Sequence, residues 1–111
     1  MSVYVYIAGP YTQGDCCVNI GEAIKVAEQL VALGYIPYIP HLTHLWHLIH
    51  NHSLEFWYAY DKLWIPKCNC MIRIPGPSNG ADREVEAATF LEKPVFYSVE
   101  ELDAYYKQLV A

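Results

Sequence analysis

Asp61 is an acidic residue inside an apolar stretch. Its neighbours on one predicted helix face recur at spacings of three and four and are apolar: Leu54, Trp57, Tyr58 and Ile65. A carboxylate among such side chains is costly unless it pairs with a cation, points into a polar cleft or has a raised pKa. Asp61 is therefore a candidate general acid. The alternative is a buried ion pair with Lys62 or Arg73.

Glu84 is the second carboxylate in a position to do chemistry. It follows Gly80, Ala81, Asp82 and Arg83 in the first turn or so of a predicted helix. There the positive end of the helix dipole would keep the carboxylate ionised, and an ionised, oriented carboxylate is a nucleophile. Acidic residues are also common in a first helical turn for stability alone. The position by itself leaves both interpretations open.

Alternating strands and helices must position these two groups. Near-continuous apolar runs predict buried parallel strands at residues 3–8, 35–39, 68–74 and 94–97. Helical spacing predicts helices at residues 20–34, 54–65, 81–91 and 100–110. This order predicts one domain over residues 1–111, a three-layer α/β sandwich with a parallel sheet of four to five strands. The backbone of the histidine-rich segment after residue 40 is left unassigned.

Loops after the strands are the expected place for a ligand, because parallel sheets bind ligands beyond the carboxyl ends of their strands. The candidate ligand-binding residues there are Gly9, Pro10, His41, Ser78, Asn79 and Gly80. His41 directly follows the second predicted strand. We expect the three loops to meet at one end of the sheet.

Three segments together carry a family resemblance. They are Tyr6-Ile7-Ala8-Gly9-Pro10-Tyr11, the helix with Asp61, and Ser78-Asn79-Gly80-Ala81-Asp82-Arg83-Glu84 followed by Ala87-Ala88. In this order they resemble the nucleoside 2-deoxyribosyltransferase family, whose superfamily includes the 2'-deoxynucleoside 5'-phosphate N-hydrolases. The resemblance covers nearly the whole chain.

The resemblance implies a flavodoxin-like (Rossmann-like) fold and cleavage of the N-glycosidic bond of a nucleoside or nucleotide. It implies that Glu84 captures the sugar at C1', that Asp61 assists the departing base and that Tyr6 lies beside the nucleophile. It also places His41 near the substrate. Water would make the enzyme a hydrolase and a second base would make it a transferase, and both stay open. Because carboxylate chemistry at C1' needs no metal or cofactor, we expect none.

Ser78 favours the phosphate-dependent branch. The hydrolases resembled here carry Ser six residues before the nucleophile, where transferases tend to carry Asp. Ser78 with the backbone N–H groups of Asn79 and Gly80 could seat a phosphate, or Ser78 could simply cap the helix. Three departures weaken the phosphate assignment: Pro10 replaces a Ser, Thr12 an Arg, and Glu86 a Gly of the resembled proteins.

A metal site is the first rival interpretation. The chain has His41, His44, His47, His50 and His52, and Cys68 and Cys70 share one strand face. The histidines alternate with leucines at a spacing that also fits a partly buried amphipathic helix. We therefore predict no metal site.

A non-catalytic nucleotide-binding or partner-binding module is the second rival, because a fold alone does not imply activity. Asp61 and Glu84 together favour retained chemistry, since a pure binder needs neither.

Composition excludes other classes. The formal net charge of −5 argues against a nucleic-acid duplex or an anionic membrane surface as partner. The longest stretch without Asp, Glu, Lys or Arg is interrupted by Gly34, Pro37 and Pro40, which argues against a membrane span. The N-terminus lacks signal-peptide features, so we expect a cytoplasmic protein whose four cysteines are free thiols.

A homodimer or larger homo-oligomer is also expected. A chain of 111 residues has little left to cover a ligand once its sheet is built. Trp46, Trp57 and Trp64 are predicted to be exposed and available for burial between subunits.

Overall fold

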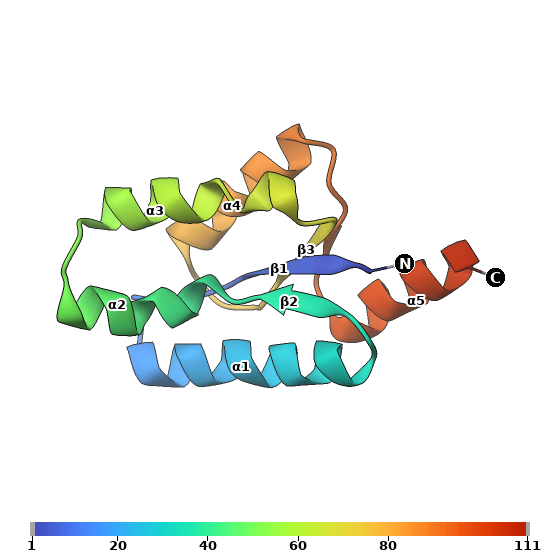
Figure 1. Cartoon of the computed structure of the whole chain (residues 1–111), viewed down its shortest axis with the longest axis horizontal. Coiled ribbons are helices and arrows are strands. Elements are labelled where there is room, and N and C mark those ends of the chain that lie inside the picture. Colours follow the sequence, from blue (N-terminus) through green and yellow to red (C-terminus); the bar gives the residue numbers. More distant parts are fainter. Residues whose placement is uncertain (1, 111) are drawn as a thin grey trace.

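The computed structural model describes residues 2–110, which form a parallel sheet with helices on both faces (Figure 1). The strands are β1 (Tyr4–Ala8), β2 (Ile36–Tyr38), β3 (Cys70–Arg73) and β4 (Val95–Phe96). The helices are α1 (Cys16–Ala32), α2 (Thr43–Ile49), α3 (Leu54–Lys62), α4 (Asn79–Phe90) and α5 (Val99–Val110). Two 3₁₀ turns, η1 (Pro40–Leu42) and η2 (Ile65–Lys67), precede α2 and β3.

The sheet has the order β2-β1-β3-β4, and every neighbouring pair is parallel. Tyr6 pairs with Tyr38 on one side and with Met71 on the other. The fold is α/β and consistent with the flavodoxin-like class, so the fold-class prediction is confirmed.

Strand alternation builds two cores. Side chains of one strand point to opposite faces in turn, so Val5 and Ile7 enter one core while Tyr6 and Ala8 enter the other. The first core lies under α1 and α5 and includes Leu30 and Leu102, which are fully buried. Burying a leucine contributes about 1.5–3 kcal/mol of folding free energy. The second core is covered by η2 and α4, the helix that carries Glu84.

The histidine-rich segment folds into η1 and α2. The helix is partly buried, as the spacing suggested, but through the side that carries His44 and His47 and not through its aliphatic side chains. Four aliphatic residues of the segment are 54–80% exposed: Leu42, Leu45, Leu48 and Ile49. α2 packs on η1 and lies at the end of the molecule away from α5 (Figure 1).

Within residues 2–110, no helix combines the length and apolar character that crossing a bilayer requires. All four cysteines are free thiols.

Candidate active site

A cavity of about 410 Å³ opens at the carboxyl end of the sheet. Loops after β1, β2 and β3 line it together with α3 and α4. Most of the predicted site residues line this cavity: Gly9, His41, Asp61, Ser78, Asn79, Gly80 and Glu84. Residues that are up to 75 positions apart in the chain, Gly9 and Glu84, therefore share one site.

Glu84 lies on the buried face of α4, with Ala81 and Ala88. It is 8% exposed, and the Tyr6 hydroxyl donates a 2.5 Å hydrogen bond to its Oε2 atom. Burial raises the pKa of the Glu84 carboxyl to about 7, against the hydrogen bond from Tyr6 and the charge of Arg73, which lower it.

The expectation that the helix dipole keeps the Glu84 carboxylate ionised is therefore wrong. The helix begins at Asn79, so Glu84 is in the second turn, beyond the part where the dipole is strongest. Desolvation dominates and raises the pKa, whereas the sequence suggested a dipole that keeps the group ionised. What favours the ionised form is the Tyr6 hydroxyl and the nearby Arg73 guanidinium.

Tyr6 itself stands behind Glu84 and does not line the cavity. Its ring is fully buried, and burial together with the charge of Glu84 raises the pKa of its hydroxyl well above the usual value. A neutral hydroxyl keeps its proton for the hydrogen bond. Tyr6 is therefore suited to holding Glu84 and not to contacting a ligand in this cavity.

Asp61 lies on α3 and faces the same cavity as Glu84. Its Oδ1 atom is buried without a hydrogen-bond partner. Burial raises the pKa of Asp61 to about 8, and the negative charge of Glu84 adds to the rise. A carboxyl that keeps its proton at neutral pH can donate it to a ligand.

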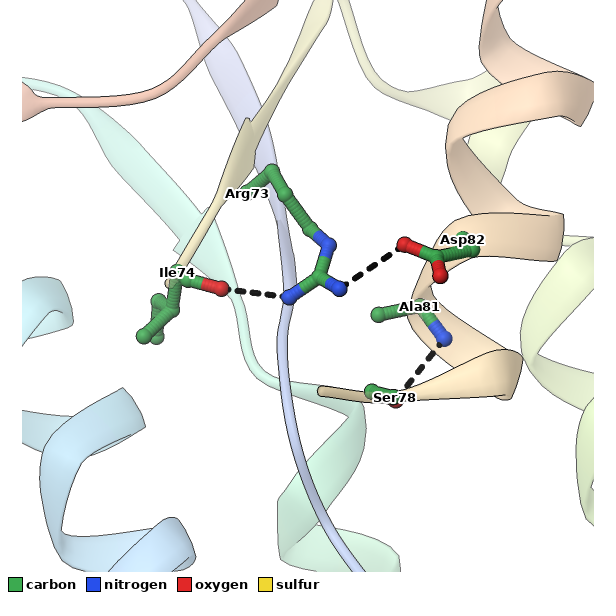
Figure 2. A network of polar contacts seen from close by, with 5 residues as sticks. All are labelled: Arg73, Ile74, Ser78, Ala81 and Asp82. Carbon is green, nitrogen blue, oxygen red and sulfur yellow. Dashed lines mark hydrogen bonds and ion pairs between the residues drawn. The ribbon is translucent and has the colours of Figure 1, made fainter. Parts of the chain in front are cut away.

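The alternative ion pairs of Asp61 do not form in the described part of the chain. Arg73 pairs with Asp82 at 2.8 Å, as Figure 2 shows, and the Lys62 ammonium lies 5.9 Å from the ring centre of Tyr58. Asp61 therefore faces the cavity uncompensated.

Ser78 is the N-cap of α4: its Oγ atom accepts a 3.0 Å hydrogen bond from the backbone N–H of Ala81 (Figure 2). The capping role that the sequence allowed is thus present. Because the hydroxyl accepts in this cap, its own proton remains free to face the cavity that Ser78 also lines.

Pro10 does not line the cavity, which differs from its predicted contact with the substrate. Its carbonyl oxygen lies 3.0 Å from His41 Nε2, and its ring fills the space beside Gly76. A Cβ on Gly76 would come within 2.9 Å of the Pro10 ring, and φ of Gly76 is +122°. Pro10 therefore fastens the loop after β1 to the loop after β3 and to His41.

His41 is 5% exposed and lines the cavity. Since a carbonyl oxygen can only accept, the Nε2 atom facing Pro10 carries the ring proton. Burial lowers the pKa of His41, outweighing the opposing effect of the Pro10 and Gly9 backbone, so the ring is neutral. Its Nδ1 atom is a buried acceptor without a partner, which a ligand O–H or N–H would satisfy.

Some lining residues were not among those predicted to bind a ligand: Tyr11, Trp57, Tyr58 and Arg83. The Arg83 guanidinium lies 3.7 Å from the ring centre of Tyr58 and 3.4 Å from Glu55. Trp57 is 6% exposed, so its predicted exposure is wrong. The signal for Trp57 and Tyr58 was their place one turn before Asp61 on the same helix face.

Metal-binding side chains do not gather in the described residues: no three His, Cys, Asp or Glu side chains within residues 2–110 form a group that could hold an ion. The site offers two carboxyls that line one cavity, a neutral imidazole acceptor, and the aromatic rings of Trp57 and Tyr58.

Comparisons with known proteins agree with this architecture. Residues 3–98 match the family described as Domain of unknown function (DUF7768), and the chain belongs to that family. No curated protein matches the chain.

Among solved structures, the chain is similar to a 2-deoxyribosyltransferase from the psychrotolerant bacterium Bacillus psychrosaccharolyticus, described as a biocatalyst for the synthesis of antiviral and antitumoral nucleosides. The TM-score is 0.67 with 23% identity, over 84% of this chain and 69% of that one. This likeness supports the fold family expected from the sequence.

Proposed function

We propose that this protein cleaves the N-glycosidic bond of a nucleoside, a deoxynucleoside or the corresponding 5'-monophosphate. The observation that carries the proposal is the pair of carboxyls in one cavity: Glu84 held by Tyr6, and Asp61 buried, unpartnered and with a raised pKa. The likeness to a 2-deoxyribosyltransferase structure supports it further. Glu84 would be the nucleophile and Asp61 the general acid.

Cleavage would proceed in two steps. A carboxylate oxygen of Glu84 attacks C1' of the sugar while the C1'–N bond breaks, and its electron pair leaves with the base. The proton of Asp61 passes to the departing base, which spares the base a negative charge. Water, or a second base, then attacks C1' and breaks the glycosyl bond to Glu84, while the Asp61 carboxylate takes up the proton that is released.

Three groups are suited to hold the substrate. The Nδ1 atom of His41 would accept a hydrogen bond from a sugar hydroxyl. The rings of Trp57 and Tyr58 offer apolar surface to the base or sugar. Ser78, with the N–H groups of Asn79 and Gly80, would seat a 5'-phosphate at the start of α4, and Arg83 on the next turn would add a cation.

A homodimer or larger homo-oligomer would complete the site. Trp46 and Trp64 are 44% and 39% exposed, so aromatic surface is available for burial between subunits. Sedimentation of the purified protein tests this half of the proposal. A strict monomer with full activity would contradict it.

The function itself is tested by incubating the protein with nucleosides, deoxynucleosides and their 5'-monophosphates and measuring free base by chromatography. Base release separates an enzyme from a binding module of the same fold. Calorimetry with matched nucleosides and monophosphates tests the phosphate seat, because a charge-assisted hydrogen bond contributes about 1.5–3 kcal/mol. Protein dialysed against a chelator should be as active as untreated protein. Loss of bound zinc together with activity would overturn the carboxylate mechanism.

A further inference from the structure

Arg73 is a buried cation on the same side of the sheet as Tyr6. It is the last residue of β3 and pairs with Ala8, whereas Met71, two residues earlier, pairs with Tyr6. Residues two apart on a strand share a face, so Arg73 projects toward the core beneath α4, where Glu84 is buried. Its residue exposure is only 8%.

Two hydrogen bonds hold the guanidinium in place (Figure 2). Its Nη1 atom donates to the carbonyl oxygen of Ile74 at 2.5 Å, and Nη2 donates to Asp82 Oδ1 at 2.8 Å. The two partners of the ion pair are unequally screened, because the side chain of Asp82 is 65% exposed and that of Arg73 is 9% exposed. Water weakens the field of Asp82 much more than that of Arg73, so the pair leaves a net positive field inside the protein.

Few titratable or charged groups are placed to influence the protonation of Glu84. The titratable and charged groups on the surrounding elements that interact with it are Tyr6 of β1, Tyr38 of β2, Asp61 of α3 and Arg73 of β3. The residues of β4, Val95 and Phe96, carry no charge, and Lys67 of η2 is exposed. Arg73 is thus the buried cation among them.

We propose that Arg73 is a positioning residue of this site: its buried guanidinium, anchored by Ile74 and Asp82, adds to the Tyr6 hydrogen bond in making Glu84, and not Asp61, the carboxyl that carries the negative charge. Two carboxyls that line one cavity and raise each other's cost of ionisation do not both ionise readily, so one of them keeps a proton. The charge of Arg73 favours the ionised form of Glu84, so the proton stays on Asp61. The chemical assignment of nucleophile and acid, which rests on the proposed function, follows from this asymmetry.

A purely structural role is the competing explanation, since the Arg73–Asp82 pair also fastens the loop after β3 to α4. The two explanations predict different effects of substituting Arg73 and of substituting Asp82. Breaking the pair at Arg73 removes the cation, whereas breaking it at Asp82 leaves the cation and removes its counter-charge. A structural role predicts the same disturbance from both changes, whereas the proposed role predicts that the Glu84 pKa rises only when Arg73 is replaced.

The test compares Arg73→Met, Arg73→Lys and Asp82→Asn in the full chain. The Glu84 carboxyl is followed by carbon-13 NMR of labelled glutamate, assigned by its absence in Glu84→Gln. Arg73→Met should raise the Glu84 pKa by about one pH unit. Arg73→Lys keeps a positive charge and should raise this pKa only slightly, and Asp82→Asn should leave it unchanged or lower it. An unchanged pKa in Arg73→Met, or a rise in Asp82→Asn, would overturn the proposal.

Folding and function are kept separate in this test. If Arg73→Met does not fold, Arg73→Lys and Asp82→Asn decide: a small rise of the Glu84 pKa in the first with no rise in the second supports the role, and any other pattern overturns it. The NMR measurement needs no turnover. Absence of base release from the parent protein would refute the proposed function even where the pKa pattern holds, and base release without that pattern would refute only the role of Arg73.

Discussion

The Tyr6 hydroxyl donates to Glu84 across 2.5 Å, which joins an inner strand of the sheet to the buried face of α4. A hydrogen bond to a charged acceptor is worth about 1.5–3 kcal/mol. Because the bond favours the ionised carboxylate, Tyr6→Phe should raise the Glu84 pKa. We predict that kcat/KM falls by about 10- to 100-fold near neutral pH, with part of the loss recovered at higher pH.

The check is the pH profile of base release by the parent and Tyr6→Phe, with Tyr97→Phe as the control on an exposed tyrosine. Glu84 must lose its proton and Asp61 must keep its own, so the parent profile should be a narrow bell set by pKa values of about 7 and about 8. A Tyr6→Phe profile with the same acidic limb as the parent would contradict the role of the hydroxyl.

Asp61→Asn removes the proton donor while keeping the size of the side chain. Loss of a general acid costs typically about 10²–10⁴-fold, and the loss should be large for natural bases and small for bases that leave readily without protonation. The measurement is kcat/KM over a series of leaving groups. An equal loss across the series would count against Asp61 as the acid.

Stability should fall as pH rises from about 5 to about 8. Burial raises the folded pKa of both Glu84 and Asp61, so the folded protein binds more protons than the unfolded chain in this range. The stability that these groups contribute is present below their unfolded pKa values and is lost as pH rises through the folded ones. Asp61→Asn and Glu84→Gln should therefore stabilise the protein at pH 8–9, by about 1–3 kcal/mol.

Urea denaturation at pH 5 and at pH 8.5 checks this prediction, with Glu86→Gln as the control at an exposed position of α4. The gain in the free energy of unfolding should be confined to the higher pH. Destabilisation of both variants at pH 8.5 would contradict the raised pKa values.

His41→Ala removes the buried Nδ1 acceptor that faces the cavity. If that atom accepts from a sugar hydroxyl, KM should rise by about tenfold for a substrate that has the hydroxyl and much less for an analogue that lacks it. The loss of the contact to Pro10 affects both substrates alike, so the difference between them isolates the ligand contact. His50→Ala, on an exposed histidine, is the control, and equal effects on both substrates would refute the contact.

The sequence predicts the sheet better than it predicts the site electrostatics, for physical reasons. Strands buried on both faces give continuous apolar runs, as in Val5 to Ala8, and such runs are local. The charge state of Glu84 depends on burial by β1 and on Arg73, eleven residues earlier in the chain, and neither is visible in the local pattern.

Asp61 shows the opposite case. Its apolar helical neighbours are a local signal, and the structure shows a raised pKa without an ion pair, one of the outcomes that the sequence left open. Pro10 was predicted to contact the substrate, and Arg73 was left as a possible partner of Asp61. Neither role could be read from the sequence, because both residues act through close contacts between loops and elements that are distant in the chain.

The most direct test of the central claim is to look for the sugar on Glu84. The parent protein is mixed with a 2'-fluorinated nucleoside, whose electron-withdrawing fluorine slows breakdown of a glycosyl intermediate, then quenched in acid and mapped by mass spectrometry. We predict release of the base together with a glycosyl group on the peptide that contains Glu84, and neither event in Glu84→Gln. A label on another residue, or equal base release from natural substrates by Glu84→Gln and the parent, would contradict the nucleophilic role of Glu84.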